Sequence, residues 1–230
     1  VSIVTRKFFR KIMHLISFVY GGNMVFTISI VFDTIIIAAV LPDGLALAGI
    51  YTLAQNIASL IQAPQRGVIS SSIGPLSQAW KNKDLARINR IYHSSSINQL
   101  IFSVAMFALI WMNFNDAVLN FHLQHRYVEA AMVFFYIGLM RIVYMGTGVN
   151  SQIIVTSTFW RFDFITGIIL LALTLPLNYV FTKYYFGVTG PAIANLISLT
   201  VYNLIRYWFL YARFAMQPFS LKTLYTLLLG

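Results

Sequence analysis

The stretch "FDTIIIAAVLPDGLALAGIYTLAQNIASLIQAPQRG", residues 32–67, decides the fold class of this chain. Two apolar runs flank the turn residues Pro42, Asp43 and Gly44, and apolar runs of about 20 residues, the length that crosses a bilayer, recur along the whole chain. Hydrophobic residues make up 59% of the 230 positions and charged residues only 10%, whereas a soluble domain carries about a quarter charged residues. A secretory signal peptide would be a single short run near the start. The sequence therefore predicts an all-α polytopic membrane protein.

The apolar runs predict six complete transmembrane helices and the start of a seventh. The expected spans are about 14–41, 45–75, 95–114, 127–155, 163–182 and 189–211, with a further helix beginning near Leu221. We expect residues 1–13 to form a cytoplasmic basic segment and residues 14–211 a six-helix transmembrane lobe. Residues 212–230 would form a cytoplasmic link and the start of a truncated seventh helix. The chain begins with Val rather than Met and ends in the apolar run "TLYTLLLG", which indicates a fragment of a longer protein.

Positive residues predict how these helices are oriented, because cytoplasmic loops carry an excess of Lys and Arg. One side of the membrane receives Arg6, Lys7, Arg10, Lys11, Lys81, Lys83, Arg87, Arg90, Arg161, Arg206, Arg213 and Lys222. The other side receives only Arg126 and Lys183. Both ends of the chain are therefore expected in the cytoplasm. The net charge of +10 then reflects topology and contact with anionic lipid rather than binding to nucleic acid.

One cytoplasmic connection, "QAWKNKDLARINRIYHSSS" at residues 78–96, has an apolar face opposite its basic residues. The apolar positions are Ala79, Leu85, Ile88 and Ile91. The pattern fits a short amphipathic helix lying on the inner leaflet, and a solvated basic loop fits it about as well.

The sequence shows no pattern that indicates catalysis or a cofactor. Cysteine is absent, so neither a disulfide nor a Cys-based metal site is available. No plausible Ser-His-Asp arrangement and no glycine-rich phosphate loop is present. We therefore expect a protein that is not an enzyme and that uses no cofactor or metal.

Three ionisable side chains, Asp33, Arg66 and Arg141, stand out within the expected spans, because charge in the bilayer is costly and usually faces a bundle interior or a wet cavity. Asp33 lies about 12 Å from the outer end of its helix, and Arg141 about 20 Å along its own, near the middle of a core roughly 30 Å thick. Asp33 fits either an ion or proton site or a buried structural carboxylate. Arg141, which shares a helical face with Gln152, should meet an anionic ligand or a carboxylate, and Asp33 is the obvious partner if the helices pack. Asn178 and Asn195 are interpreted as contacts between helices.

A stripe of polar residues follows the helix after the Pro42–Gly44 turn, and its members are Tyr51, Gln55, Ser59, Gln62 and Arg66. At 100° per residue they fall within about 80° of one another, so the stripe indicates the wall of a cavity, with plain helix packing as the alternative. Pro64 removes a backbone hydrogen bond and predicts a kink. Arg66 is about 32 Å along the helix, near the inner interface, where an arginine can also snorkel.

Several segments, in order along the chain, resemble the Wzx-type polysaccharide flippases of the multidrug/oligosaccharidyl-lipid/polysaccharide exporter superfamily. The matching pieces are Asp33 near the end of one span, "GIYTLA" opening the next, and "AP" with Arg66 before a run of small residues. "DLARINRIYHSS" leads into the third span, and "GVTGPAIANLIS" at residues 187–198 and "QPFSLKTL" at residues 217–224 follow. Each piece alone is weak, but the ordered set covers most of the chain.

This resemblance implies a MATE-like transporter with two lobes around a central cavity, of which this chain is the C-terminal lobe and the N-terminal lobe is the missing partner. It implies a bacterial inner-membrane protein that flips a polyprenyl-pyrophosphate-linked oligosaccharide for polysaccharide, lipopolysaccharide or O-antigen biosynthesis. Transport would proceed by alternating access.

The resemblance also assigns roles to the polar residues. Arg66 matches the family's cavity arginines, which meet the pyrophosphate–sugar headgroup, and Arg141 is given the same role because of its burial. The remaining substrate-binding residues are expected to be Tyr51, Gln55, Gln62 and Gln152. Two alternatives stay open: a cation-coupled multidrug exporter of the same fold, with Asp33 as the ion-coupling site, and a membrane scaffold without transport.

Overall fold

The computed structural model describes residues 6–120 and 125–219, and within these residues the chain is helical without a β-strand. The elements are α1 (Arg6–Val40), α2 (Gly44–Ser59), a 3₁₀ turn (Leu60–Gln62), α3 (Gln65–Lys81), α4 (Leu85–Asn120), a 3₁₀ turn (His125–Glu129), α5 (Ala130–Gly146), α6 (Asn150–Val155), α7 (Trp160–Val180), a π-helical turn (Phe181–Phe186), a 3₁₀ turn (Gly187–Thr189) and α8 (Gly190–Phe214). The predicted all-α class is confirmed.

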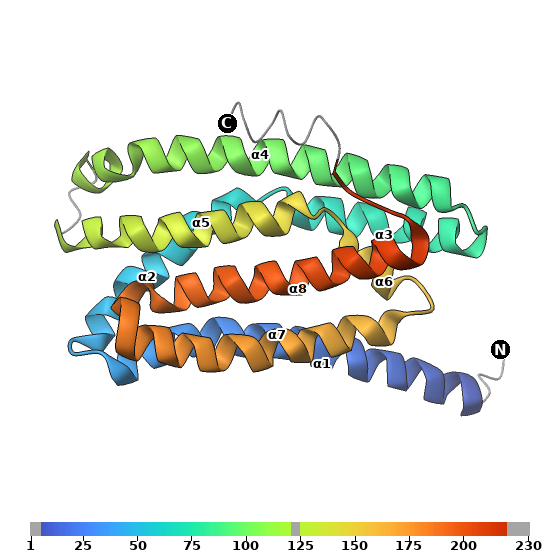
Figure 1. Ribbon diagram of the computed structural model, residues 1–230, viewed down its shortest axis with the longest axis horizontal. Coiled ribbons are helices and arrows are strands. Elements are labelled where there is room, and N and C mark those ends of the chain that lie inside the picture. The colour runs from blue at the N-terminus through green and yellow to red at the C-terminus, as the bar shows by residue number, and fades with distance from the viewer. Residues whose placement is uncertain (1–5, 121–124, 220–230) are drawn as a thin grey trace.

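The long helices lie side by side and alternate in direction, so their connections gather at two opposite ends of the bundle (Figure 1). The α1–α2, α4–α5 and α7–α8 connections lie at one end. The start of α1, the α3–α4 turn, the connection through α6 to α7 and the end of α8 lie at the other, which we call the basic end because it carries Arg10, Lys81, Arg87, Arg161 and Arg213. Helix α1 packs on α2 and α7, α5 on α4 and α8, and α7 on α8.

Four segments of the described residues are long and apolar enough to cross a membrane, namely Gly44–Gln62, Leu85–Asn120, Tyr127–Gly146 and Trp160–Phe214. The last segment contains both α7 and α8, and α1 adds the shorter apolar segment Val31–Val40. These helices indicate a multi-pass membrane protein. The count of six spans, the three-part division of the chain and the orientation of its ends stay predictions, and the expected seventh helix lies outside the described residues.

The predicted turn between the first two spans depends on two residues. Asp43 has a φ of 57°, in the left-handed region that Asp tolerates better than most residues. Gly44 is buried, and a Cβ at this position would lie 2.5 Å from the carbonyl oxygen of Ala38. Because no side chain fits there, the sequence Pro42–Asp43–Gly44 brings α2 back against α1.

The connection at residues 78–96 differs from both predictions made for it. It is not a separate helix, because α3 continues to Lys81 and α4 already begins at Leu85, and only the short connection between them is exposed loop. Ala79 and Ile88 are fully buried and pack with Tyr92 in a core cluster that also includes residues of α6 and α8. Of the predicted apolar face, Ala79 and Ile88 are thus buried against other helices, whereas Leu85 is exposed and Ile91 is half-buried.

Aromatic rings fix the packing of α5 on α4. The ring centroids of Phe107 and Phe134 are 5.8 Å apart, and those of Trp111 and Phe135 are 4.8 Å apart. Gly138 permits this approach, because a Cβ on it would overlap the ring of Phe107. The packing sets the rotation of α5 and therefore the direction in which its polar residues point.

Candidate functional site

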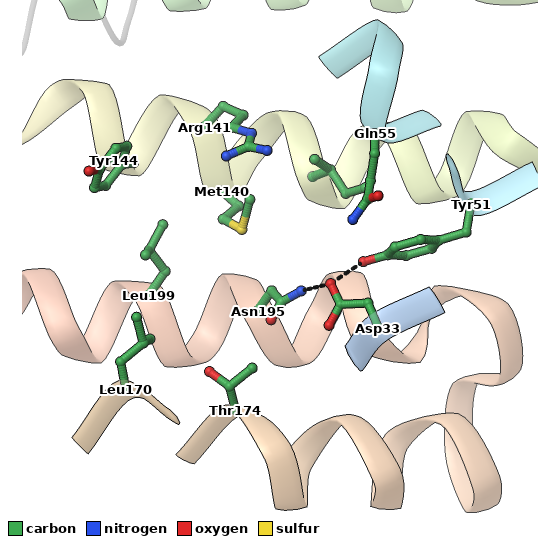
Figure 2. Close-up of a pocket in the computed structure, with 11 residues that line it drawn as sticks. Asp33, Tyr51, Gln55, Met140, Arg141, Tyr144, Leu170, Thr174, Asn195 and Leu199 are labelled. Carbon is green, nitrogen blue, oxygen red and sulfur yellow. Dashed lines mark hydrogen bonds between the residues drawn. The ribbon is translucent and has the colours of Figure 1, made fainter. Parts of the chain in front are cut away.

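A cavity lies between α1, α2, α5, α7 and α8, and polar side chains reach into it from several of these helices (Figure 2). Its lining consists of Asp33, Tyr51, Gln55, Ile137, Met140, Arg141, Tyr144, Leu170, Thr174, Asn195 and Leu199. The cavity volume of about 50 Å³ is room for a few water molecules. Of the predicted site residues, the fold brings Asp33, Tyr51, Gln55 and Arg141 together here.

Asp33, on α1, is 1% exposed and accepts three hydrogen bonds. Its Oδ2 accepts from the Tyr51 hydroxyl at 3.0 Å and from Asn195 Nδ2 at 2.6 Å, and its Oδ1 accepts from Asn178 Nδ2 at 2.5 Å. Burying a carboxylate is costly without partners, and each hydrogen bond to a charged group contributes about 1.5–3 kcal/mol. The carboxylate therefore ties α1 to α2, α7 and α8. The two asparagines are helix contacts, as predicted, but their partner is the charge of Asp33.

Arg141 reaches the same cavity from α5 and does not pair with Asp33. The two residues, both described, are close enough for a Coulombic interaction but form no ion pair. The Nε of Arg141 is buried and has no hydrogen-bond partner in the described part of the chain. In Figure 2 the carboxylate of Asp33 is already occupied by Tyr51 and Asn195, whereas the guanidinium of Arg141 stands apart from them. A guanidinium with unused donors beside a cavity suits an anionic group.

The polar stripe does not continue along one wall. Tyr51 and Gln55 line the cavity, but Ser59 and Arg66 are exposed and Gln62 is half-buried outside the cavity lining. Helix α2 ends at Ser59, and the 3₁₀ turn before Pro64 has 3.0 residues per turn instead of 3.6. The helix is interrupted before Pro64, as predicted, and this interruption takes Gln62 and Arg66 off the regular helical face of Tyr51 and Gln55. Ser59 is already exposed within α2.

Gln152 is also separated from Arg141, contrary to the prediction that the two share a helical face. Helix α5 ends at Gly146, and Gly148 has a φ of 61°, so the chain turns before α6 begins. A Cβ on Gly148 would lie 2.8 Å from the hydroxyl oxygen of Ser95 on α4. Gln152 is half-buried on α6 and does not line the cavity.

Sequence reasoning missed a second buried charge, Arg206 on α8. It is 1% exposed, forms an ion pair with Asp163 of α7, and donates from Nε to Thr166 Oγ1 at 3.3 Å. Its guanidinium carbon lies 3.9 Å from the ring centroid of Tyr202, and Ser151 donates to Asp163 at 3.1 Å. The sequence assigned Arg206 to the cytoplasmic surface. The sequence does contain a signal for this pair: Asp163 lies near the start of α7 and Arg206 near the end of α8, and these two ends meet when consecutive helices pack antiparallel.

With this geometry the chain has the fold of MATE transporters. It superposes on an inward-facing multidrug resistance MATE family transporter of the MOP superfamily with a TM-score of 0.70 and 18% identity, over 88% of this chain and 48% of that one. A MATE in the bent conformation gives 0.68 and 18%, over 84% and 43%. A MOP superfamily transporter from Pyrococcus furiosus Vc1 (DSM3638), described as having a binding pocket of reverse polarity that suggests a different function, gives 0.59 and 20%, over 90% and 48%.

These comparisons confirm the predicted MATE-like fold and leave the finer assignment to Wzx-type flippases a prediction. The chain spans about half the length of the solved structures that it matches. No protein-family model matches the sequence, and no curated protein matches it.

Proposed function

We propose that this chain is one lobe of an inner-membrane transporter that moves a polyprenyl-pyrophosphate-linked oligosaccharide by alternating access. The MATE fold supports transport, because inward-facing and outward-facing conformations of a MATE transporter both resemble this chain. The observation that carries the substrate class is Arg141, whose buried Nε lacks a partner among the described residues and whose side chain lines the same cavity as Asp33. A pyrophosphate would supply the missing acceptors through charge-assisted, bidentate hydrogen bonds.

The size of the cavity limits what this lobe does alone. A volume of about 50 Å³ holds a few waters and no sugar chain. The lobe would therefore form one wall of a larger cavity, which the missing N-terminal lobe completes. In this arrangement Arg141 contacts the pyrophosphate, Gln55 donates to sugar hydroxyls, and the polyprenyl tail stays in lipid.

Arg66 is proposed as an earlier contact for the same headgroup. It is exposed in the first turn of α3, which begins at Gln65 directly after Pro64. Unpaired backbone amides at a helix N-terminus favour an anion, and an arginine beside them adds to this preference. Gln62 in the preceding 3₁₀ turn and Gln152 on α6 lie outside the cavity lining, and a role in substrate binding for them requires contact in another conformation.

Asp33 is proposed as the ion-coupling site. Asn178 and Asn195 each carry an amide oxygen beside their donating nitrogen, and rotating either amide would turn this oxygen toward a cation at the carboxylate. Carboxylate and amide oxygens are the ligands that hard cations prefer, and a proton on Asp33 would neutralise it in the same way. If Asp33→Asn transports normally and keeps its dependence on the ion gradient, this role is wrong.

A cation-coupled multidrug exporter is the second candidate, and the carboxylate of Asp33 on the cavity wall favours it. One feature weighs against it: a cationic drug in this cavity would face the guanidinium of Arg141.

The proposal is tested by complementation with the full-length protein in a strain that lacks it. Arg141→Gln is expected to abolish most surface-polysaccharide export at unchanged membrane levels, Arg66→Gln to reduce it, and Arg141→Lys to restore part of it. Arg90→Gln, which removes an exposed charge on α4, is the matched control and should export normally. Intact export in both Arg141→Gln and Arg66→Gln would contradict the flippase proposal and favour a membrane scaffold without transport. A null strain that keeps its surface glycan but becomes drug-sensitive would favour the multidrug exporter.

A further inference from the structure

Two apolar clefts lie on either side of a ridge on α8, away from the cavity that holds Asp33 and Arg141. The larger, of about 890 Å³, runs along α8 past Trp208 and is walled by Phe162 of α7. The smaller, of about 210 Å³, lies between α8, α4 and α5 and includes Val143 in its lining. Leu204 and Tyr207 line both clefts, so they form the ridge that separates them.

The ridge faces outward from the bundle. Leu204 is 57% exposed, Tyr207 is half-buried, and the neighbouring Trp208 is 68% exposed. Exposed apolar surface of this extent marks a site of interaction with protein or membrane. In a membrane-spanning helix, Trp208 and Tyr211 have the amphipathic rings that occur at the level of lipid headgroups.

The larger cleft ends at positive charge. Arg213 lines the cleft in the last turn of α8, and its guanidinium carbon lies 5.6 Å from the ring centroid of Phe159. Arg161 follows Phe159 by two residues and is exposed. The structure gives neither arginine an ion-pair partner in the ranges it describes, and the nearby carboxylate of Asp163 is occupied by Arg206.

We propose that this face of α8 binds one anionic phospholipid of the bilayer leaflet at the basic end. Its two acyl chains would lie on either side of the Leu204–Tyr207 ridge, and its phosphate would meet Arg213 and Arg161 through guanidinium hydrogen bonds. The dimensions agree, because Leu204 and Arg213 are about 14 Å apart along the helix at 1.5 Å per residue, close to half of a hydrocarbon core roughly 30 Å thick.

The positive charge of Arg161 and Arg213 favours a phospholipid over a further helix of the same protein as the occupant of the clefts. An apolar helix would fill the clefts and leave the two exposed arginines to water, whereas a phospholipid fills the clefts and also pairs with both guanidinium groups. The preference should be electrostatic and should therefore separate anionic from zwitterionic lipids of the same chain length.

The test uses the full-length protein reconstituted in mixed nanodiscs of palmitoyl-oleoyl phosphatidylglycerol and phosphatidylcholine, with retained lipids counted by native mass spectrometry. The wild type should retain phosphatidylglycerol over phosphatidylcholine by roughly tenfold. Arg161→Gln with Arg213→Gln should remove most of this preference. Arg87→Gln with Arg90→Gln removes the same charge from exposed residues of α4 near the same end and should leave the preference unchanged.

If both double variants lose the preference for phosphatidylglycerol equally, the preference comes from general surface charge and the proposed site is wrong. An unchanged preference in Arg161→Gln with Arg213→Gln would also contradict the proposal. A phosphatidylglycerol with a diazirine in one acyl chain should label the α8 peptide that contains Leu204. If it does not label α8, another segment covers the clefts and the proposal is wrong. Retention of a polyprenyl phosphate in place of phosphatidylglycerol would equally overturn it.

Discussion

Replacing Asp163 with Asn should destabilise the protein through its partner Arg206. The guanidinium of Arg206 is 1% exposed, and without Asp163 it keeps only the Thr166 hydroxyl and the face of Tyr202. Breaking a buried ion pair by removing one partner costs about 3–5 kcal/mol. The side chain of Asp163 is 24% exposed and Asn retains one acceptor oxygen, so we expect a loss of about 2–3 kcal/mol in the free energy of unfolding.

The reverse change should cost less. Arg206→Met leaves a carboxylate that water reaches and that Ser151 still bonds, so we expect a loss of about 1–2 kcal/mol. The double variant should lose no more than Arg206→Met alone, because Met fills the site without a charge. The sum of the two single losses then exceeds the loss in the double variant by about 2–3 kcal/mol, a coupling expected for residues in contact.

The assay is unfolding of the purified full-length protein in mixed micelles with increasing dodecyl sulfate, followed by tryptophan fluorescence. Asp116→Asn, at an exposed position of α4, is the matched control and should stay within about 0.5 kcal/mol of the wild type. If Asp163→Asn behaves like this control, or if the single losses add up in the double variant, the buried ion pair does not stabilise the bundle as argued.

Two further changes test local parts of the account. Gly148→Ala should destabilise the protein by about 1–2 kcal/mol, because φ is 61° and the new Cβ would meet the Ser95 hydroxyl. The control Gly167→Ala, with open space around it in α7, should be neutral or stabilising by up to about 1 kcal/mol. Equal melting temperatures for the two variants would count against backbone strain at position 148. Tyr51→Phe removes one of three hydrogen-bond donors to Asp33 and should lower the free energy of unfolding by about 1.5–3 kcal/mol in the same assay. A decrease below about 0.5 kcal/mol would mean that the Tyr51 hydroxyl does not stabilise the buried carboxylate.

The helices could be predicted because they depend on local pattern. Continuous apolar runs placed the fifth and sixth spans within three residues of the ends of α7 and α8, and Asp43 and Gly44 marked the turn between α1 and α2. The pattern failed where the helical period changes. A 3₁₀ turn before Pro64 and the break at Gly148 rotate the residues that follow, so Arg66 and Gln152 left the faces that a regular helix predicts.

The contents of the site were harder to predict because they depend on distant contacts. Asp33 was identified as a buried charge from its depth alone, but its partners Asn178 and Asn195 are 145 and 162 positions away. No local pattern shows which helices meet. Arg206 was misplaced for the same reason, since a basic residue near a helix end is typical of a topology signal until the facing carboxylate is known.

The central claim, that Arg141 recognises an anionic headgroup, is tested most directly by transport in vesicles. The full-length protein, reconstituted in liposomes, is supplied with a polyprenyl-pyrophosphate-linked fluorescent sugar, and arrival at the opposite leaflet is measured by quenching. We predict that the wild type transports this lipid and that Arg141→Gln transports it more slowly by about tenfold or more, the loss of one charge-assisted contact, while Arg90→Gln is unaffected. Equal rates for Arg141→Gln and the wild type would contradict the claim.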